Sequence, residues 1–287
     1  MSQSRRGQDL EIASPGRVTP LFARLIHRFL LPVVRVLWRP TLTGTENLPT
    51  SGPYLLVANH SAGVGFAEIH CFIALYLDQV GPAHPLAGFA LPVGFRIWPL
   101  SAVHRQIGTI PSTYEAAAAT LARGVPILVF PGGDHESLAP IWESNHVDFA
   151  GRLGFLRIAH RAQVPIVPLG IRGGHMTAPI VLRSRLLANL LVTPRLIFGV
   201  KRWGASLLGV LGALAFAVFL PLEWPWRALL IWLWLGSPVT FLPWLPWTVR
   251  MRAGTPLPAR ELLGDGSDAA LRQALVRVQD AVQAARP

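Results

Sequence analysis

Three short apolar segments, each followed closely by turn-forming residues, constrain the fold more than any other feature of the sequence. They are Tyr54–Ala58, Pro126–Phe130 and Pro165–Leu169. All three are apolar on both faces, which is typical of strands in a parallel sheet that helices cover on both sides. Segments with a helical pattern alternate with these strands. This alternation predicts an α/β fold around a mainly parallel sheet flanked by helices.

The helical segments carry end signals. The run Ser112–Glu115 is a capping box that opens an alanine-rich helix, and Gly124 closes that helix. Residues 152–162 are predicted to form another helix. Ser267 is expected to cap the last helix. Its apolar residues recur at helical spacing, at Leu271, Leu275, Val278 and Val282.

The residues before this domain divide into two parts. Residues 1–19 are predicted to be a disordered start, and residues 20–43 are predicted to hold an amphipathic helix from Pro20 to Trp38 and the first strand. The arginines on one side of this helix are Arg24, Arg28 and Arg35. A basic amphipathic helix is typical of a membrane interface. The alternative is a helix packed on its own domain.

A second apolar region, residues 204–249, is unusual for a soluble domain. Its two stretches, Gly204–Leu222 and Ala228–Val249, each approach the roughly 20 residues that span a bilayer. Positive residues flank the pair, at Arg195, Lys201, Arg202, Arg250 and Arg252. By the positive-inside rule, both ends stay on the cytoplasmic side. We therefore expect an inserted helical hairpin that enters the membrane and returns. The alternative is a hairpin buried in the core.

Composition points to a membrane surface as well. Hydrophobic residues make up 51% of the chain and charged residues only 14%, whereas ordinary soluble domains have about 25% charged residues. The net charge of +11 comes almost entirely from arginine, since Lys201 is the only lysine. A basic and apolar chain favours an anionic membrane over nucleic acid. No secretory signal is visible. We expect a location on the cytoplasmic face of the inner membrane.

Cysteine and metal chemistry are not indicated. The single Cys71 excludes an internal disulfide and a cysteine-rich metal site, and it is expected to be a small core residue. Histidines and acids occur near each other in the sequence, but not at the helical spacing that zinc motifs use. We therefore expect no bound metal.

The sequence VANHSAGVGFAE, residues 57–68, presents a histidine at the end of a predicted strand. Sites in α/β sheets lie at the carboxyl ends of strands. His60 is therefore a candidate general base, and Asn59 and Ser61 beside it are candidates for substrate binding. The alternative is a structural histidine.

The sequence VFPGGDHES, Val129–Ser137, is a second strand that ends in a glycine turn. Gly132 and Gly133 let backbone N–H groups approach a ligand closely, where they stabilise an oxyanion or hold a phosphate. Asp134 is a further candidate for binding substrate. The alternative is a tight turn with solvated acids. Arg105 precedes another helix start and is a candidate for contacting an anion.

Four motifs in this order are recognisable: ENLPTSGPYLLVANHS, RQIGTIPSTYEAAAATLARGVPILVFPGGD, DFAGRLGFLRIAHRAQVPIVPLGIRGGH and VRMRAGTPLP. Together they resemble the glycerophospholipid acyltransferase family, which includes lysophosphatidic acid acyltransferases. The resemblance covers roughly residues 44–180 and resumes near 248–258. It implies that residues 44–287 are an acyltransferase domain interrupted by the hairpin. It also implies a membrane-bound enzyme of lipid metabolism that moves a fatty acyl group from acyl-CoA or acyl carrier protein to a glycerolipid hydroxyl, with no further cofactor.

The resemblance also implies roles for individual residues. His60 is then the general base that takes the proton of the acceptor hydroxyl as its oxygen attacks the thioester. No acyl-enzyme need form. Backbone N–H groups near Gly132 and Gly133 would hold the tetrahedral oxyanion.

Two positions depart from the family pattern. The family has Asn-His, four residues and then Asp, but the position of that Asp is Gly65 here. The family's third motif often reads Phe-Pro-Glu-Gly-Thr-Arg, whereas this chain has Phe130-Pro131-Gly132-Gly133-Asp134-His135. The Pro-Gly-Gly form resembles the branch nearer mono- and diacylglycerol acyltransferases. The resemblance therefore does not carry phosphate recognition over to this motif.

Glu68 is the predicted replacement for the missing acid. If a helix begins near Gly65, Glu68 lies on the same face about 4.5 Å further along the axis. Its longer side chain leans back toward the helix start and toward His60. Asp134 and Glu136 are the rival acids, and a surface role for Glu68 is the further alternative. Without any orienting acid, the chain would be a catalytically impaired relative that binds lipid. A lipid hydrolase is disfavoured because no Gly-x-Ser-x-Gly motif is present.

Overall fold

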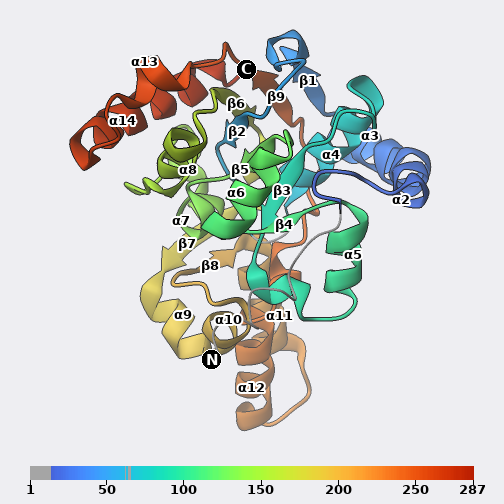
Figure 1. Ribbon diagram of the computed structural model, residues 1–287. Coiled ribbons are helices and arrows are strands. Elements are labelled where there is room, and N and C mark those ends of the chain that lie inside the picture. The colour runs from blue at the N-terminus through green and yellow to red at the C-terminus, as the bar shows by residue number, and fades with distance from the viewer. Residues whose placement is uncertain (1–13, 62, 64–65) are drawn as a thin grey trace, which may run out of the picture.

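A computed structural model describes residues 14–61, 63 and 66–287. Its centre is a seven-stranded sheet in the order β1-β9-β6-β2-β5-β3-β4, with helices on both faces (Figure 1). The strands are β1 Thr41–Thr43, β2 Leu55–Ala58, β3 Ala87–Ala90, β4 Ile110–Pro111, β5 Ile127–Val129, β6 Ile166–Arg172 and β9 Arg250–Ala253. Strands β6, β2, β5, β3 and β4 are parallel, while β9 runs antiparallel to β6 and pairs in parallel with β1. The predicted α/β class with a mainly parallel sheet is confirmed.

Strand β2 shows why the apolar runs become central strands. It pairs with β5 on one side and with β6 on the other, so its backbone groups are used in both directions. Successive side chains alternate between the faces. Leu55 and Val57 accordingly contribute to one hydrophobic core, and Leu56 and Ala58 to the other. All four are fully buried, which explains the absence of polar residues in the run.

One face of the sheet is covered by the helices of the second half of the domain. They are α6 Tyr114–Ala122, α8 Gly154–Ala162, α13 Ala259–Leu263 and α14 Asp268–Ala285. Helix α14 buries the apolar face predicted for it, and the Ser267 hydroxyl accepts the Ala270 N–H as its cap. Residues Leu121, Leu156 and Val278 pack from three of these helices onto the strands.

The other face is covered by the helices that precede β2 and follow it. They are α2 Pro20–Leu25, the π-helical η1 Ile26–Leu30, α3 Leu31–Leu37 and α4 Ala67–Gln79. The first three are continuous and pack through Leu31 and Val34, and Arg35 pairs with Asp78 of α4 at 2.7 Å. Large apolar side chains on the outer side stay exposed, at Leu21, Phe29, Val33 and Val36. This N-terminal helix therefore packs on its own domain and keeps an exposed apolar side.

Short elements connect the larger ones. They are η2 Thr45–Asn47, η3 Pro92–Phe95, α5 Leu100–Gln106, α7 Gly133–Ser137, η4 Ile141–Glu143 and η5 Gly174–Met176. Both α7 and η5 begin just after central strands, so they lie at the carboxyl end of the sheet.

A smaller unit lies beyond that end of the sheet (Figure 1). Its elements are β7 Ile180–Ser184, α9 Arg185–Leu191, α10 Thr193–Phe198, β8 Trp203–Ser206, α11 Leu207–Phe219, α12 Trp224–Leu235 and η6 Pro238–Phe241. Strands β7 and β8 pair antiparallel. Helices α11 and α12 run antiparallel, since Trp234 Nε1 donates to the Gly209 carbonyl at 2.9 Å and Arg227 donates to the Ala217 carbonyl at 3.0 Å. They form a helical pair that extends away from the sheet (Figure 1).

The two helices of this pair are shorter than the sequence predicts. Helices α11 and α12 have 13 and 12 residues. At 1.5 Å per residue each is only about 20 Å long, against about 30 Å for the hydrocarbon core of a bilayer. Strand β8 takes the first residues of the first apolar stretch, and the prolines at Pro238, Pro243 and Pro246 stop α12 from continuing. Within the described residues, no helix has both the length and the apolar character needed to span a membrane.

Two predicted segment ends need correction. Residues 14–19 belong to the fold, because Gly16 N–H donates to the Gly108 carbonyl at 2.7 Å. The remainder of the predicted disordered start, residues 1–13, lies outside the described residues. Helix α6 is capped by Thr113, whose hydroxyl accepts the Ala116 N–H at 3.2 Å, so the cap predicted at Ser112 is one residue too early.

Candidate active site

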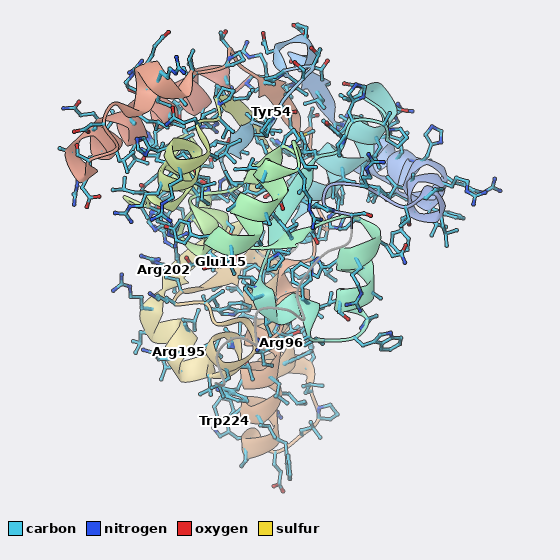
Figure 2. The ribbon with its side chains drawn as sticks, in the orientation of Figure 1. Tyr54, Arg96, Glu115, Arg195, Arg202 and Trp224 are labelled. Carbon is cyan, nitrogen blue, oxygen red and sulfur yellow. The ribbon has the colours of Figure 1, made fainter. Side chains whose placement is uncertain are left out.

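Three neighbouring parallel strands bring the candidate residues together. β2 ends at Ala58, β5 at Val129 and β6 at Arg172, and β2 lies between the other two. The carboxyl ends of all three therefore meet at one edge of the sheet. Tyr54, just before β2, lies at the opposite edge, while Trp224 of α12 lies beyond the carboxyl edge (Figure 2). The site thus faces the side of the molecule that carries the helical pair.

His60 and Glu68 form a buried pair at this edge. His60 Nδ1 lies 2.7 Å from Glu68 Oε1, and the two residues are 7% and 0% exposed. A carboxylate only accepts hydrogen bonds, so His60 Nδ1 carries the proton and Nε2 keeps its lone pair free. Glu68 lies in the first turn of α4, as the sequence predicts. Gly65, where the family pattern has Asp, lies outside the described residues.

Ser61 contributes to this pair through its backbone. Its N–H donates to the same Glu68 Oε1 at 2.9 Å, so one carboxylate oxygen orients both the imidazole and the turn behind it. Gly174 of η5 packs directly against Ser61, because a Cβ on Gly174 would lie 2.0 Å from Ser61 Oγ. The predicted role of Ser61 was substrate binding. Its side chain instead faces Gly174 and is 1% exposed.

Asn59 is engaged with the neighbouring strand. Its amide donates to the Ile171 carbonyl at 2.9 Å and accepts the Ile171 N–H at 2.7 Å. These two hydrogen bonds continue the pairing of β2 with β6 past the end of β2. Both ends of the buried amide are used there. Asn59 therefore clamps the strand end, and the substrate contact predicted for it is not seen.

Two aromatic rings lie against the imidazole. The Phe130 ring centroid is 4.6 Å from that of His60, and the Phe66 centroid is 5.6 Å away with the planes 12° apart. Phe66 precedes α4 with a left-handed backbone (φ 53°), and Phe130 directly follows β5. These rings make the immediate surroundings of the base apolar. Neither residue was identified as part of the site from the sequence.

The glycine turn after β5 lies next to His60, as predicted, but its two N–H groups differ. Gly133 N–H donates to the Phe130 carbonyl at 3.2 Å and is not free for a ligand. The N–H groups of His60, Ser61 and Gly63 are also used, by Glu136, Glu68 and the Ser137 carbonyl. Gly132 N–H donates to no group in the described part of the chain. It is therefore one N–H of this turn that is available to an oxyanion.

Asp134 and the arginines around it neutralise each other. Arg152 pairs with Asp134 at 2.5 Å and also donates to the carbonyls of Pro131 and Gly132. Arg202 lies 3.8 Å from the same carboxylate. These cations keep the pKa of Asp134 below its ordinary value although burial opposes them. Asp134, predicted to bind substrate, takes part in an internal ion pair with Arg152, which also bonds to the glycine turn.

Arg105 lies on α5 rather than at the carboxyl ends of β2, β5 and β6. Its guanidinium donates to Ser101 Oγ, one turn earlier in the same helix, at 3.4 Å. The structure therefore does not join Arg105 to the His60 site. Within residues 14–61, 63 and 66–287, no group of three or more His, Cys, Asp or Glu side chains is arranged to hold a metal ion.

His175 is a buried histidine that sequence reasoning did not assign to the site. It lies in η5 after β6 and is 7% exposed. Burial lowers the pKa of His175 to about 4; Glu68 opposes this shift, while Arg286 and His60 add to it. His175 is therefore neutral in the folded protein at pH 7. The only signal in the sequence was its place in a glycine turn after a strand.

This buried histidine predicts acid sensitivity. The unfolded chain binds a proton at His175 near pH 6.5, whereas the folded chain does so only near pH 4. Stability is therefore lost as pH falls from 6.5 toward 4, and His175 should cost about 2 kcal/mol of unfolding free energy at pH 5. Urea unfolding at pH 7 and pH 5 measures this loss. In His175→Asn the loss should shrink by that amount, and an unchanged difference between the two pH values would contradict the assignment.

The comparisons with known proteins agree with this geometry. Residues 39–172, which contain His60, Glu68 and the glycine turn after β5, match the family model described as Acyltransferase. Residues 39–172 are an acyltransferase-family domain. This match agrees with the resemblance to the glycerophospholipid acyltransferase family.

Curated relatives are similar over part of their length. An uncharacterized protein of Mycobacterium tuberculosis (strain H37Rv) is 32% identical over 178 residues, covering 61% of this chain and 49% of the relative. An uncharacterized protein of Mycobacterium leprae is 28% identical over 201 residues, covering 70% and 52%. Chloroplastic phytyl ester synthase 2 of Arabidopsis thaliana is 28% identical over 149 residues, covering 50% and 21%. The chain spans about half the length of the mycobacterial relatives it matches.

A solved structure shares the fold of this chain. It is the 1-acyl-sn-glycerophosphate acyltransferase PlsC from Thermotoga maritima, with a TM-score of 0.50 and 18% sequence identity. The match covers 90% of this chain and 77% of that chain. At this identity the likeness concerns the fold, and it agrees with the mainly parallel sheet flanked by helices.

Proposed function

We propose that the chain is a membrane-associated acyltransferase of lipid metabolism. It moves a fatty acyl group from acyl-CoA or acyl carrier protein to a hydroxyl of a glycerolipid. The buried contact between His60 Nδ1 and Glu68 Oε1, at 2.7 Å, carries the proposal because it leaves Nε2 as an oriented base. The absence of an acid at position 65 was the observation favouring a catalytically impaired lipid-binding relative. Glu68 supplies an acid in contact with His60, so that observation no longer favours the alternative.

The reaction follows from this arrangement. His60 Nε2 takes the proton of the acceptor hydroxyl as the hydroxyl oxygen attacks the thioester carbonyl carbon. The Glu68 carboxylate stabilises the imidazolium that forms. The Gly132 N–H stabilises the oxyanion of the tetrahedral intermediate. When the carbon–sulfur bond breaks, the thiolate takes the proton from His60, which restores the base and releases a thiol and an ester.

Charge around the site favours an acceptor without a phosphate. Arg152 and Arg202 share the single carboxylate of Asp134. Arg183 is paired with Glu143 at 2.9 Å, and the rings of Phe66 and Phe130 lie against the base. Monoacylglycerol and diacylglycerol are therefore better acceptors than lysophosphatidate in this proposal. The name of the plant relative, a phytyl ester synthase, is in line with an alcohol acceptor.

The test supplies labelled acyl-CoA or acyl carrier protein to purified protein in mixed micelles. The acceptors are lysophosphatidate, monoacylglycerol, diacylglycerol and a long-chain alcohol, each tested separately. We expect labelled ester with an uncharged acceptor and much less with lysophosphatidate. Release of free fatty acid without any ester would reject acyl transfer. A preference for lysophosphatidate would reject only the uncharged acceptor.

We also propose that the α11–α12 pair contacts the membrane, on the cytoplasmic face of the inner membrane. Phe219 is 80% exposed and Trp224 is 67% exposed at the end of the pair that lies away from the sheet. Apolar side chains this exposed are typical of a membrane contact. Phe241 of η6 packs against Gly63 beside His60, so the base of the unit borders the site.

Vesicle flotation tests this membrane contact. Trp224→Glu should reduce binding to vesicles of anionic phospholipid several-fold, because a charge is costly at an apolar membrane contact. Val276→Glu is the control, since Val276 is 57% exposed on α14, at the far side of the sheet from α12 (Figure 1). Equal binding by both variants and the parent protein would reject the contact.

A further inference from the structure

Glu136 is a buried carboxyl that the proposed reaction does not use. It is 4% exposed and lies in α7, directly after the glycine turn. Its Oε2 accepts the backbone N–H of His60 at 2.8 Å, and its Oε1 accepts the backbone N–H of Asp148 at 3.3 Å. Glu68 thus holds the ring of His60, while Glu136 holds its backbone. We propose that Glu136 is a positioning residue for His60. Position 132 is then glycine because a larger residue there would occupy the space through which the Glu136 carboxyl reaches the His60 N–H.

Two reasons for a glycine at position 132 can be distinguished, namely steric space and backbone conformation. The φ of Gly132 is −63° and its ψ is −28°, values that any residue adopts. A glycine is therefore not required here for conformational freedom. A Cβ on Gly132 would lie 2.3 Å from Glu136 Oε2 and 2.4 Å from Glu136 Cβ. The smallest side chain at position 132 would therefore displace the carboxyl that holds His60.

Helix α7 is itself held in place, so the bond from the His60 N–H to Glu136 ties His60 to a fixed element. Arg152 donates to the carbonyls of Pro131 at 3.0 Å and Gly132 at 2.7 Å, just before α7. At the other end of α7, the Ser137 carbonyl accepts the Gly63 N–H at 2.8 Å. The His60 turn is therefore bonded to α7 at two points, through the backbone N–H of His60 itself and through that of Gly63.

The ionisation of Glu136 suits this role. Burial raises its pKa to about 8, and the nearby Asp148 carboxylate adds to the rise. The N–H groups of His60 and Asp148 and the Arg286 guanidinium act in the opposite direction. At pH 7 the carboxyl is therefore mostly neutral, and its carbonyl oxygen accepts the His60 N–H. Glutamine presents the same oxygen without a charge.

The inference rests on the proposed acyl transfer, and the variants to compare are E136A, E136Q and G132A. E136A should lower kcat about 10²-fold with KM little changed, because a misplaced base slows the chemistry more than it weakens binding. E136Q should recover most of that loss. G132A should behave like E136A, and the double variant G132A/E136A should be no slower than either single one. E261Q, at an exposed glutamate on α13, is the matched control and should keep parent activity.

Hydrogen exchange at the His60 amide, read by mass spectrometry, supplies a measurement that does not need turnover. Exchange should be faster in E136A and G132A and close to the parent rate in E136Q. Parent-like kcat in E136A, or equal losses in E136A and E136Q, would overturn the positioning role. If the exchange pattern is as expected but the parent protein transfers no acyl group, the contact stands and the proposed function fails.

Discussion

Replacing Glu68 by glutamine is expected to lower kcat by about 10²- to 10³-fold, within the range known for the acid of a histidine–acid pair. The glutamine oxygen still accepts from His60 Nδ1 and Ser61 N–H, which Glu68 Oε1 does in the parent protein. The lost quantity is negative charge beside the imidazolium, which forms only during the reaction. KM should therefore change little. Steady-state kinetics with saturating acyl-CoA and acceptor measure the effect.

Two further variants sharpen this result. Glu68→Ala also removes the acceptor oxygen, so the ring is free to rotate and the loss should exceed that of glutamine. E261Q again serves as the exposed control. Circular dichroism and the thermal midpoint establish that each variant is folded. Activity of a folded E68Q within about threefold of the parent would mean that another group orients His60. A tenfold rate change corresponds to about 1.4 kcal/mol of activation free energy, and a threefold change to less than that.

Replacing His60 by alanine is expected to abolish ester formation, with a loss of about 10³-fold or more, because general base catalysis typically supplies 10²- to 10⁴-fold. The proton of the acceptor hydroxyl then has no base in reach. The measurement is labelled ester after incubation with labelled acyl-CoA. His84→Ala is the control, since His84 is exposed and, among the described residues, its side chain bonds only to the nearby Val80 carbonyl, through Nδ1.

The double variant H60A/E68Q tests whether the two residues act as one unit. Residues of such a unit are strongly non-additive, so the double variant should be no slower than H60A alone. Full activity of H60A would reject the assignment of the base. Binding of lipid by an inactive parent protein would instead support the alternative of a non-catalytic relative.

Much of the fold could be predicted because one physical pattern dominates it. Leu55 on one face of β2 and Leu56 on the other are both apolar because helices cover both sides of the sheet. Glu68 could also be predicted as the acid, although α4 begins at Ala67 and not near Gly65. The predicted pairing with His60 is seen at 2.7 Å.

The remaining site residues could not be assigned because their partners are distant in sequence. Asn59 bonds to Ile171, and nothing near Asn59 indicates that its amide is already used. Asp134 is paired with Arg152 by the folding of the loop between β5 and α8. Glu136 was considered as an acid for the imidazole ring, but its contact is with the His60 backbone. Sequence spacing predicts contacts within one helix, and these contacts join different elements.

The length of the two helices beyond the sheet was overestimated for a different reason. Hydropathy does not distinguish a strand from a helix in an apolar stretch, so β8 was included in the predicted hairpin. Pro238, Pro243 and Pro246 lie within the second apolar stretch, so α12 ends at Leu235 and does not continue to Val249.

The place of Glu68 has a consequence for how such proteins are found. A search pattern that requires an acid five positions after the histidine would discard this chain, although the acid sits against the imidazole. A pattern that also accepts an acid at the eighth position, where Glu68 lies in the first turn of α4 and contacts His60, would retain it. Active members are therefore to be sought among sequences that fixed-spacing patterns classify as degenerate, and the variant E68Q decides whether such sequences deserve that label.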